Sequence, residues 1–503
     1  MVYTKSMQKR MSGTWVVWAL IALYVLVFGA VVVMRHAHFE TQVWDLGIFA
    51  HSFWNATQGR GLINTVEQVP NHLGVHFSPF LFLLVPGYAF FQALSAQAGP
   101  YYLLIMQTLA LALGAWPLFL LAKRILAEQQ NTALWALAIV TAYLLYPSLH
   151  WMNLFDFHEA TFFVPVLLGA LYFLEAKKWI WAGVFLAAAA AVKEDMVLGV
   201  LFAGLFVLAQ VTAQESTTAD LPVWRRTGVQ AGIIVVASAL VYFLLVVKVF
   251  MPAAGGELFR IDRYANLGET PLVMVTNAIK HPLLIPETVF TPQKARYVFW
   301  LLLPLLFLPL LSWRPVLLLI PGLAENLLTN YPFQFSSLYH YDAILIPGIF
   351  LAAIYGIKSA LTRWPNKEKY LGVALLLAAL IGFMFRSPLN PWSFPVSYFK
   401  TTPRETAYRN MLRLVPPQVS VAAHTNFIPH LTDRREVYFA GFEQKRVDIV
   451  LLDAGDPFGF GSEKALANYV EDYQHSGEYN SYIFSNRYVV LLNKKLGMLR
   501  ESQ

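Results

Sequence analysis

The chain has no cysteine among its 503 residues. Disulfide bonds, thiolate metal sites and a cysteine nucleophile are therefore excluded. Charge is scarce too, because Asp, Glu, Lys and Arg supply only 13% of the residues, against about 25% in an ordinary soluble domain. Since 57% of the residues are hydrophobic, the composition is typical of a membrane protein and excludes a soluble multidomain enzyme.

The hydrophobic residues gather in apolar runs of roughly membrane-spanning length, separated by short polar breaks. The formal net charge is +7, but a basic patch for nucleic acid needs a soluble surface. Most of the chain has no soluble surface for such a patch, so no nucleic-acid partner is expected. The eleven candidate spans are residues 15–34, 101–122, 132–148, 160–176, 179–192, 196–211, 229–250, 297–312, 315–328, 343–361 and 370–385.

Basic residues in the loops predict how these runs are oriented, because short cytoplasmic loops are enriched in Lys and Arg. The apolar segment 78–97 contains Pro86-Gly87 and could span or lie in the interface as a re-entrant or juxtamembrane helix. If it does not cross, short cytoplasmic loops carry thirteen basic residues and short outer loops only Lys193. We therefore predict eleven spans, with the N-terminus cytoplasmic and the C-terminus extracytoplasmic. The thirteen are Lys5, Lys9, Arg10, Lys123, Arg124, Lys177, Lys178, Arg225, Arg226, Arg314, Arg363, Lys367 and Lys369.

The composition changes near residue 387. Residues 387–503 hold 13 basic and 12 acidic side chains among 117 residues, which is close to the soluble norm. Short β-branched runs alternate there with a helical stretch, which predicts a small α/β layer. We therefore expect a transmembrane domain, 1–386, with outer loops 35–100 and 251–296, and a soluble extracytoplasmic α/β domain, 387–503. The strand runs are 419–423, 437–439, 447–452 and 488–492, and the helical stretch is 462–473.

In the predicted orientation, charged and polar residues collect on the outer side of the membrane. Charges at the bilayer edge are costly unless they are solvated or paired, so such clusters are functional hypotheses by default. The clusters are Asp45, His72 and His76 in the first outer loop, Asp156-Phe157-His158-Glu159, Lys193-Glu194-Asp195, Arg260 and Arg263 in the segment 251–296, and His340-Tyr341-Asp342.

Each cluster also has a purely structural interpretation. Asp45 can simply cap the helix that follows it, and the ions of the segment 193–195 can face water in an interfacial turn. Pro70 and Gly74 argue against a regular helix, so a helical metal-binding pair of His72 and His76 is disfavoured. The cluster 156–159 has the residue types of a divalent-ion or acid–base site, and equally those of a hydrogen-bonded loop network.

These residues carry a family resemblance. An Asp in the first outer loop after an N-terminal signal-anchor helix, a proline-bearing apolar segment, a dibasic helix end and an outer soluble domain resemble the GT-C superfamily. Its members are integral-membrane glycosyltransferases that use polyprenyl-phosphate-linked sugars. More narrowly, the chain resembles, over nearly its whole length, a large prokaryotic family of predicted membrane proteins of unknown function. The motifs are Trp44-Asp45-Leu46-Gly47-Ile48-Phe49, His72-Leu73-Gly74-Val75-His76-Phe77-Ser78-Pro79, Phe155-Asp156-Phe157-His158-Glu159, Lys193-Glu194-Asp195 and Tyr339-His340-Tyr341-Asp342.

The resemblance implies inverting transfer of a hexosyl or pentosyl group from a polyprenyl-phosphate sugar lipid to an envelope glycan, lipid or protein, on the outer face of the prokaryotic cytoplasmic membrane. The superfamily's first-loop acid corresponds to Asp45, the expected base, and Asp156 is the second catalytic candidate. A carboxylate can take a proton from a hydroxyl, and Lys or Arg can neutralise a departing phosphate. The candidate substrate-binding residues are His72, His76, His158, Lys193, Glu194, Asp195, Arg260, Arg263, His340 and Asp342.

A divalent cation, Mg²⁺ or Mn²⁺, is a candidate cofactor, with Asp45, Asp156 and Glu159 as its ligands. Residues 72–76 stand where several branches of the superfamily have a short Lys/His-Pro-Pro motif, so the resemblance does not extend to how the donor is recognised. Two other functions stay open: a transporter or flippase of a lipid-linked or anionic solute, and a non-catalytic envelope assembly protein. The inverted repeats and interrupted helices of many transporters are not visible in the sequence.

Overall fold

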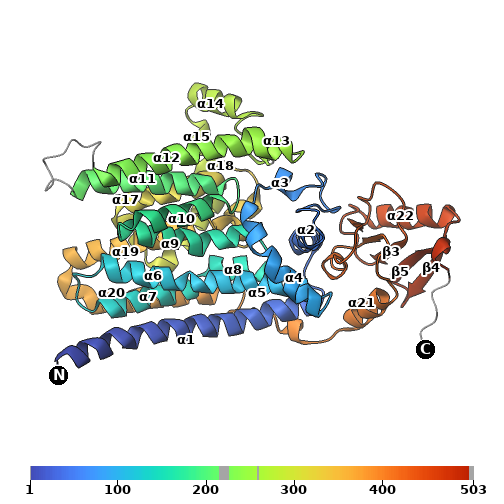
Figure 1. Cartoon of the computed structure of the whole chain (residues 1–503), viewed down its shortest axis with the longest axis horizontal. Helices are drawn as coiled ribbons and strands as arrows, with labels where there is room; N and C mark the ends of the chain where they lie inside the picture. The colour runs from blue at the N-terminus through green and yellow to red at the C-terminus, as the bar shows by residue number, and fades with distance from the viewer. Residues whose placement is uncertain (1, 215–225, 258–259, 498–503) are drawn as a thin grey trace.

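A helical bundle and a smaller sheet-containing region make up the molecule (Figure 1). The computed structural model describes residues 2–214, 226–257 and 260–497. Arg225, one of the basic residues used to predict the orientation, lies outside these ranges. The first described residues lie at the end of the bundle far from the sheet, and the last described residues lie beside the sheet (Figure 1).

Every predicted apolar run contains helical structure, because in lipid the backbone groups of a segment must satisfy one another. The first run lies in α1 (Val2–Ala37), which runs along the bundle in Figure 1. The other helices before the sheet are α2 (Ile48–Thr57), α3 (His72–Val75), α4 (Val85–Leu94), α5 (Ala98–Leu113), α6 (Ala115–Ile125), α7 (Thr132–Leu144), α8 (Pro147–Leu154), α9 (Phe163–Glu175), α10 (Trp179–Ala190), α11 (Met196–Gln214), α12 (Thr227–Leu245), α13 (Met251–Ala253), α14 (Pro271–Lys280), α15 (Leu284–Val289), α16 (Pro292–Leu302), α17 (Trp313–Val316), α18 (Ile320–Leu328), α19 (Ile346–Arg363) and α20 (Glu368–Arg386).

Four helical segments of the described chain are long and apolar enough to cross a membrane, and a fifth is added if the bent pair α7 and α8 is one span. Two further apolar helices, Trp179–Ala190 and Met196–Gln210, are shorter. The predicted number of eleven spans and the predicted orientation therefore stay predictions. The four segments are Gly13–Ala37, Ala98–Ile125, Thr227–Ala253 and Pro365–Arg386.

Two of the predicted spans are broken rather than continuous. In the run 297–312, α16 gives way to short 3-10 turns at Pro304, and Leu306 and Phe307 have positive φ values of 53° and 55°. Proline removes a backbone donor and its ring clashes with the preceding turn, which ends a regular helix. The run 315–328 is divided in the same way, with a 3-10 turn between α17 and α18.

The apolar segment 78–97 forms a 3-10 turn followed by α4. Ten helical residues cover about 15 Å, which is half of a bilayer core of about 30 Å. The helix packs beside α2 and α5, and the Tyr88 hydroxyl donates to the carbonyl of Ala50 at 3.0 Å. Whether this segment crosses the membrane stays a prediction.

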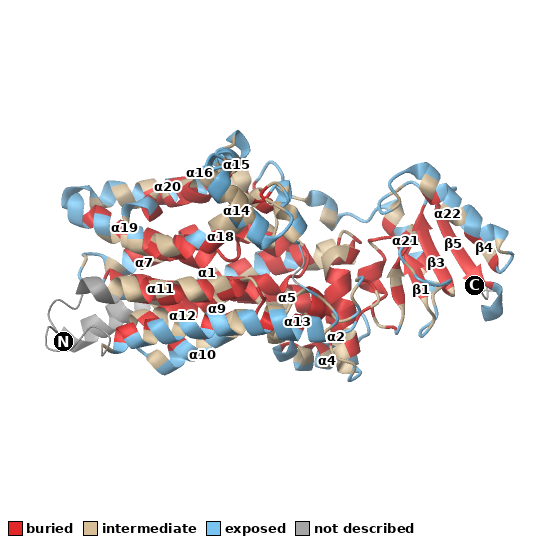
Figure 2. Ribbon diagram, turned by 90° about the horizontal axis from the view of Figure 1, so that it is seen from above, coloured by how far each residue is buried: buried red, intermediate tan, exposed pale blue. Residues whose placement is uncertain are grey.

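Burial separates an inner and an outer face of the bundle. In Figure 2 the buried residues, in red, lie on the inward faces of the helices and across the sheet. Large apolar side chains also cover the outside of the helices, for example Leu23, Ile180 and Phe385, which are 57%, 83% and 66% exposed. Such extensive apolar exposure marks a surface that contacts lipid or protein, which agrees with the membrane composition.

The C-terminal region contains the predicted small sheet. Its strand order is β2-β1-β3-β5-β4; β1 is parallel to β2 and β3, and β5 is antiparallel to β3 and β4. Each of the four predicted strand runs forms a strand, and the predicted helical stretch forms α22. The edge strand β4 was not predicted. The elements are α21 (Pro403–Arg413), β1 (Val421–Ala423), β2 (Val437–Phe439), β3 (Ile449–Asp453), α22 (Glu463–His475), β4 (Tyr479–Phe484) and β5 (Tyr488–Asn493).

The sheet region packs directly against the loop that follows α1. Val43 and Ile48 of this loop share an apolar cluster with Ile428 and other residues beside the sheet. A Cβ on Gly47 would come within 2.9 Å of the Ile428 side chain, so this close approach requires glycine. The Val43 amide also donates to the Thr425 hydroxyl at 3.1 Å. This packing fixes the position of the short segment that contains Asp45.

Candidate functional site

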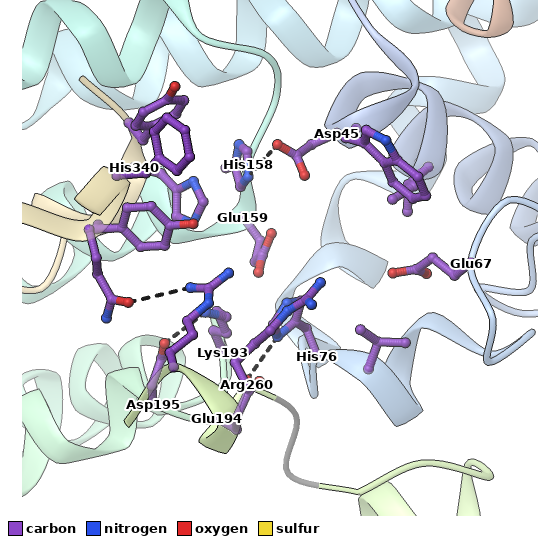
Figure 3. A pocket seen from close by; sticks show the side chains of 18 of the residues that line it. Asp45, Glu67, His76, His158, Glu159, Lys193, Glu194, Asp195, Arg260 and His340 are labelled. Atoms are coloured by element: carbon purple, nitrogen blue, oxygen red, sulfur yellow. Dashed lines mark hydrogen bonds and ion pairs between the residues drawn. The ribbon is translucent and has the colours of Figure 1, made fainter. Parts of the chain in front are cut away.

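A cavity of about 890 Å³ lies where the bundle meets the sheet region. Its charged and imidazole side chains come from parts of the chain that are far apart in sequence (Figure 3). We call it the acid–histidine cavity. Its titratable lining residues, tyrosines aside, are Asp45, Glu67, His72, His76, His158, Glu159, Lys193, Glu194, Asp195, Arg260, Arg263, Glu325 and His340.

Asp45 forms a close pair with His158. Asp45 lies in a π-helical turn, Val43–Gly47, between α1 and α2, and His158 lies in the loop after α8. The distance from His158 Nε2 to Asp45 Oδ2 is 2.9 Å (Figure 3). The Asp45 side chain is 26% exposed and that of His158 only 7%. Both residues line the cavity. The carboxylate is the more exposed member of the pair, and the imidazole that holds it is the more buried one.

The electrostatics of this pair favour a charged His158. Burial lowers the pKa of His158, but the charge of Asp45 and the hydrogen bond to it outweigh that effect and raise the pKa above its usual value. The ring of His340 stacks on that of His158 with 3.7 Å between centroids. Burial, together with the charge of His158, lowers the pKa of His340. The pKa values of the two stacked rings are thus shifted in opposite directions, that of His158 toward the protonated form and that of His340 toward the neutral form.

Asp156 lies outside the cavity lining. Its carboxylate accepts hydrogen bonds from the Arg35 guanidinium at the end of α1 and, at 2.7 Å, from the Gln42 amide. Asp342 also lies outside it and accepts from the Tyr297 hydroxyl at 2.6 Å. These two predicted site residues therefore do not line the cavity. Each carboxylate instead accepts a hydrogen bond from a largely buried side chain of the bundle.

The predicted metal ligands are not brought together. Within residues 2–214, 226–257 and 260–497, no three or more His, Asp or Glu side chains are arranged to hold a metal ion. Asp45 contacts His158 and Asp156 contacts Arg35, whereas Glu159 lines the cavity with one carboxylate oxygen buried and without a hydrogen-bond partner. The described residues therefore do not bring together the three ligands that were predicted for a divalent cation.

His72 and His76 each pair with a carboxylate. His72 Nδ1 lies 2.9 Å from Glu67 Oε2, and His76 Nδ1 lies 2.8 Å from Glu194 Oε1. The expectation that this segment is not a regular helix is corrected in part: α3 is a single turn, with the Asn71 side chain accepting from the Leu73 amide. Neither histidine is paired with the other for a metal ion; each balances an acid.

The segment between α10 and α11 forms an ion network. Lys193 Nζ donates to Asp195 Oδ2 at 2.7 Å, so this lysine is paired with a carboxylate of its own segment. Burial lowers the pKa of Lys193, but the charges of Asp195 and Glu194 outweigh it and raise the pKa. Burial also acts to raise the pKa of Glu194, yet His76 and Lys193 lower it to about 2. Lys193 is thus a fixed, compensated charge.

The two arginines of the outer segment differ in their surroundings. The guanidinium of Arg263 lies 4.3 Å from the ring centre of Tyr331 and 5.4 Å from that of Tyr341. Arg260 also lines the cavity, and no acidic side chain among the described residues forms an ion pair with it. Arg260 is therefore the cation of this cavity most available to an anionic ligand.

Sequence reasoning missed several lining residues. Glu67 lies in the first outer loop, and Glu325 is the one acid in the apolar run 315–328; an acid in such a run was a usable signal. Trp44, Phe442 and Phe458 also line the cavity, and the last two come from the sheet region. No local pattern connects those two residues to Asp45.

The fold and the cavity define a polytopic helical membrane protein with an acid- and histidine-rich pocket at the end of its bundle. The chain belongs to the family described as "Predicted membrane protein (DUF2079)", whose pattern matches residues 35–490. This confirms the narrower of the two resemblances seen in the sequence. The comparison with curated proteins finds no match.

Two solved structures of the oligosaccharyltransferase from Archaeoglobus fulgidus are similar to this chain. The complex with Zn and sulfate has 12% sequence identity and a TM-score of 0.44, covering 95% of this chain and 74% of that one. The apo form has 10% identity and a TM-score of 0.43, covering 96% of this chain and 75% of that one.

Proposed function

We propose that the protein is a GT-C-type glycosyltransferase that moves a sugar, with inversion, from a polyprenyl-phosphate-linked donor to an envelope glycan, lipid or protein. The observation that carries the proposal is the Asp45–His158 pair, whose carboxylate faces a cavity that also holds Arg260. The volume of about 890 Å³ is at the upper end of the range for ligand pockets. The sequence resemblance to the GT-C superfamily supports the same reaction class.

Asp45 is the proposed base. One of its oxygens, Oδ2, is held by His158, which leaves Oδ1 for the hydroxyl of the acceptor. The hydroxyl proton passes to this carboxylate while the acceptor oxygen bonds to the anomeric carbon. The bond from that carbon to the lipid phosphate breaks, and its electron pair stays on the phosphate oxygen. His158 is a positioning residue that fixes the carboxylate, as second groups do for catalytic bases.

Arg260 and Lys193 are the proposed partners of the lipid phosphate. A cation placed where negative charge develops stabilises the transition state, and charged hydrogen bonds to phosphate are among the strong ones. Because Lys193 is already paired with Asp195, Arg260 supplies most of the attraction. Glu159 has a buried oxygen without a partner, which suits it to accept from a sugar hydroxyl.

The sheet region supplies one wall of the proposed acceptor site. Phe442 and Phe458 line the cavity and are 51% and 45% exposed, and the Phe442 ring centre lies 6.5 Å from that of Trp44, the residue before Asp45. Flat apolar faces of this kind pack against the C–H face of a sugar ring or against an aromatic side chain. The acceptor thus has a surface beside the base.

The proposed function is tested by mass spectrometry of lipid-linked sugars and envelope glycans in cells with and without the protein. A glycosyltransferase predicts that one polyprenyl-phosphate sugar accumulates in cells lacking it and that one glycan loses a residue. Purified protein with that lipid and the acceptor should then restore the product. If the purified protein instead only moves the lipid between leaflets of a vesicle, the transfer reaction is refuted and the flippase hypothesis is supported.

A further inference from the structure

A second cavity, of about 840 Å³, lies between α6, α9 and α19. In Figure 1 these helices are labelled in the part of the bundle away from the sheet. The helix α9 begins a few residues after His158 and ends at Glu175, which lines this cavity. Its thirteen residues cover about 20 Å, so the two cavities lie near opposite ends of the bundle.

Basic side chains dominate the lining, and we call this second pocket the basic cavity. Lys123 and Arg124 come from the end of α6, Lys177 follows α9, and Lys358 comes from α19. Among the described residues, Glu175 is the one acid in the lining. Four cations therefore surround a space that contains a single carboxylate.

Glu175 does not neutralise this charge by a direct ion pair. The Tyr355 hydroxyl donates to Glu175 Oε1 at 2.5 Å, and the Gln210 amide donates to the Tyr355 oxygen at 2.5 Å. This chain of hydrogen bonds ties α9, α19 and α11 together and orients the carboxylate toward the tyrosine. A buried polar network of this kind is rigid when all its members are satisfied.

The cations keep donors free for a ligand. Toward the described residues, Arg124 donates only from Nε, to the Glu175 carbonyl at 2.6 Å, so its two terminal amino groups remain. The Lys123 ammonium lies 5.3 Å from the Phe119 ring centre. Lys358 lies 3.8 Å from Glu128 Oε2, whose side chain is 83% exposed, and such exposed pairs contribute little.

We infer that the basic cavity binds a phosphate-bearing anion. Arg presents a forked set of donors to phosphate oxygens and Lys adds a point charge, and the volume admits more than a lone phosphate. Basic pockets between helices at a cytoplasmic face bind anionic lipid headgroups, and the predicted orientation places these residues there. The inference is independent of the proposed transfer reaction. The phosphate comes either from such a lipid or from a free phosphate compound.

The test uses the purified full-length protein and the double variant Lys123→Gln/Lys358→Gln. Its matched control is Lys367→Gln/Lys369→Gln, which removes two charges from another predicted cytoplasmic loop. Thermal unfolding is followed with phosphatidylglycerol, phosphatidylcholine, glycerol 3-phosphate or inorganic phosphate. We expect an anionic phosphate ligand to bind the wild type and the control equally, and the double variant about 30-fold more weakly, from roughly fivefold per basic residue.

The source of the phosphate follows from the probes. Stabilisation by phosphatidylglycerol alone identifies a lipid headgroup, whereas stabilisation by glycerol 3-phosphate or inorganic phosphate identifies a soluble ligand. Equal binding of phosphatidylglycerol and phosphatidylcholine with no response to the soluble phosphates, or equal losses in the double variant and the control, overturns the inference. If the double variant does not fold, Lys177→Gln at an exposed position gives the same test with a loss of about fivefold.

Discussion

The two cavities of this molecule compensate their charges in opposite ways. In the acid–histidine cavity, three carboxylates each meet an imidazole at 2.8 to 2.9 Å. In the basic cavity, the one lining acid among the described residues is bound to a tyrosine, and Lys358 has only the exposed Glu128 at 3.8 Å, so positive charge is left in excess. Histidine–carboxylate pairs can hold or release protons near neutral pH, whereas unmatched Lys and Arg provide fixed positive charge. The first arrangement suits chemistry and the second suits anion binding.

The largest expected effect is at Asp45, the proposed base, which is paired with His158. The change Asp45→Asn keeps the shape and removes the negative charge, so we expect kcat/KM for sugar transfer to fall about 10²- to 10⁴-fold, the usual range for acid–base assistance. The measurement is transfer from the lipid donor by purified protein. Asp472→Asn on the exposed face of α22 is the control and should keep full activity. Near-normal turnover by folded Asp45→Asn protein would assign the base to another residue.

The next largest expected effect is on stability and concerns Asp156, which pairs with Arg35 outside the cavity lining. Asp156→Ala leaves the Arg35 guanidinium, 11% exposed, without its partner, and breaking a buried ion pair costs about 3–5 kcal/mol. We expect a large loss of thermal stability in detergent. The control Glu40→Ala breaks the pair with Arg404, whose side chains are 38% and 35% exposed, and should cost under about 1 kcal/mol. Equal small losses would show that the buried pair is not structural.

The local sequence patterns predicted which residues line the cavity better than they predicted which side chains those residues contact. All the candidate site residues except Asp156 and Asp342 line one cavity. A charged side chain beside an apolar run is costly in lipid, so it faces a cavity or a partner inside the protein. The partner of Asp156 is Arg35, 121 residues away, and no spacing rule reveals such a pair. Phe442 and Phe458 reach the cavity only because the sheet region packs on the loop before α2.

For the fold as well, the sequence patterns predicted most of the elements but missed one strand and one helix break. Apolar runs predicted helices, and β-branched runs predicted four of the five strands. The missed strand, β4, lies at the edge of the sheet, and its residues 479–484 mix polar and aromatic side chains, of which three are exposed and two half-buried. Edge strands need less apolar sequence because one side faces water. The break at Leu306 and Phe307 was missed although Pro304 precedes it, because both residues are apolar and continue the hydrophobic run.

A third prediction separates the free cation of the acid–histidine cavity from the paired one. Arg260→Gln removes a charged donor without breaking an ion pair, so donor binding should weaken about 10- to 100-fold, from roughly 1.5–3 kcal/mol per charged hydrogen bond. Lys193→Gln leaves Asp195 unpaired and should mainly lower stability. Titration of each folded variant with the lipid donor measures the difference. If Lys193→Gln lost more donor affinity than Arg260→Gln, the assignment would be reversed.

A fourth prediction concerns pH and the Asp45–His158 pair. The folded pKa of His158 is raised, so the pair's contribution to stability is complete below the ordinary histidine pKa of about 6.5 and is lost as pH rises through the raised value. The wild type should therefore lose thermal stability as the pH rises above about 6.5, and His158→Gln should lose less. His475→Gln at an exposed position should behave as the wild type does. A larger pH dependence in His158→Gln would contradict the sign.

The smallest expected effect is at the aromatic wall, where the sheet region contributes to the cavity without charge. Phe442→Ala removes a ring that is 51% exposed and stacked on Phe439 at 5.2 Å between centroids. Aromatic contacts of this kind contribute about 0.5–1.5 kcal/mol, so KM for the acceptor should rise about 2- to 12-fold while kcat and the affinity for the lipid donor stay unchanged. Phe484→Ala on the edge strand β4, 38% exposed, removes a comparable ring outside the cavity and should leave KM unchanged. A fall in kcat with unchanged KM would mean that the ring acts through Trp44 on the position of Asp45, and the sheet region would then support the base rather than the acceptor.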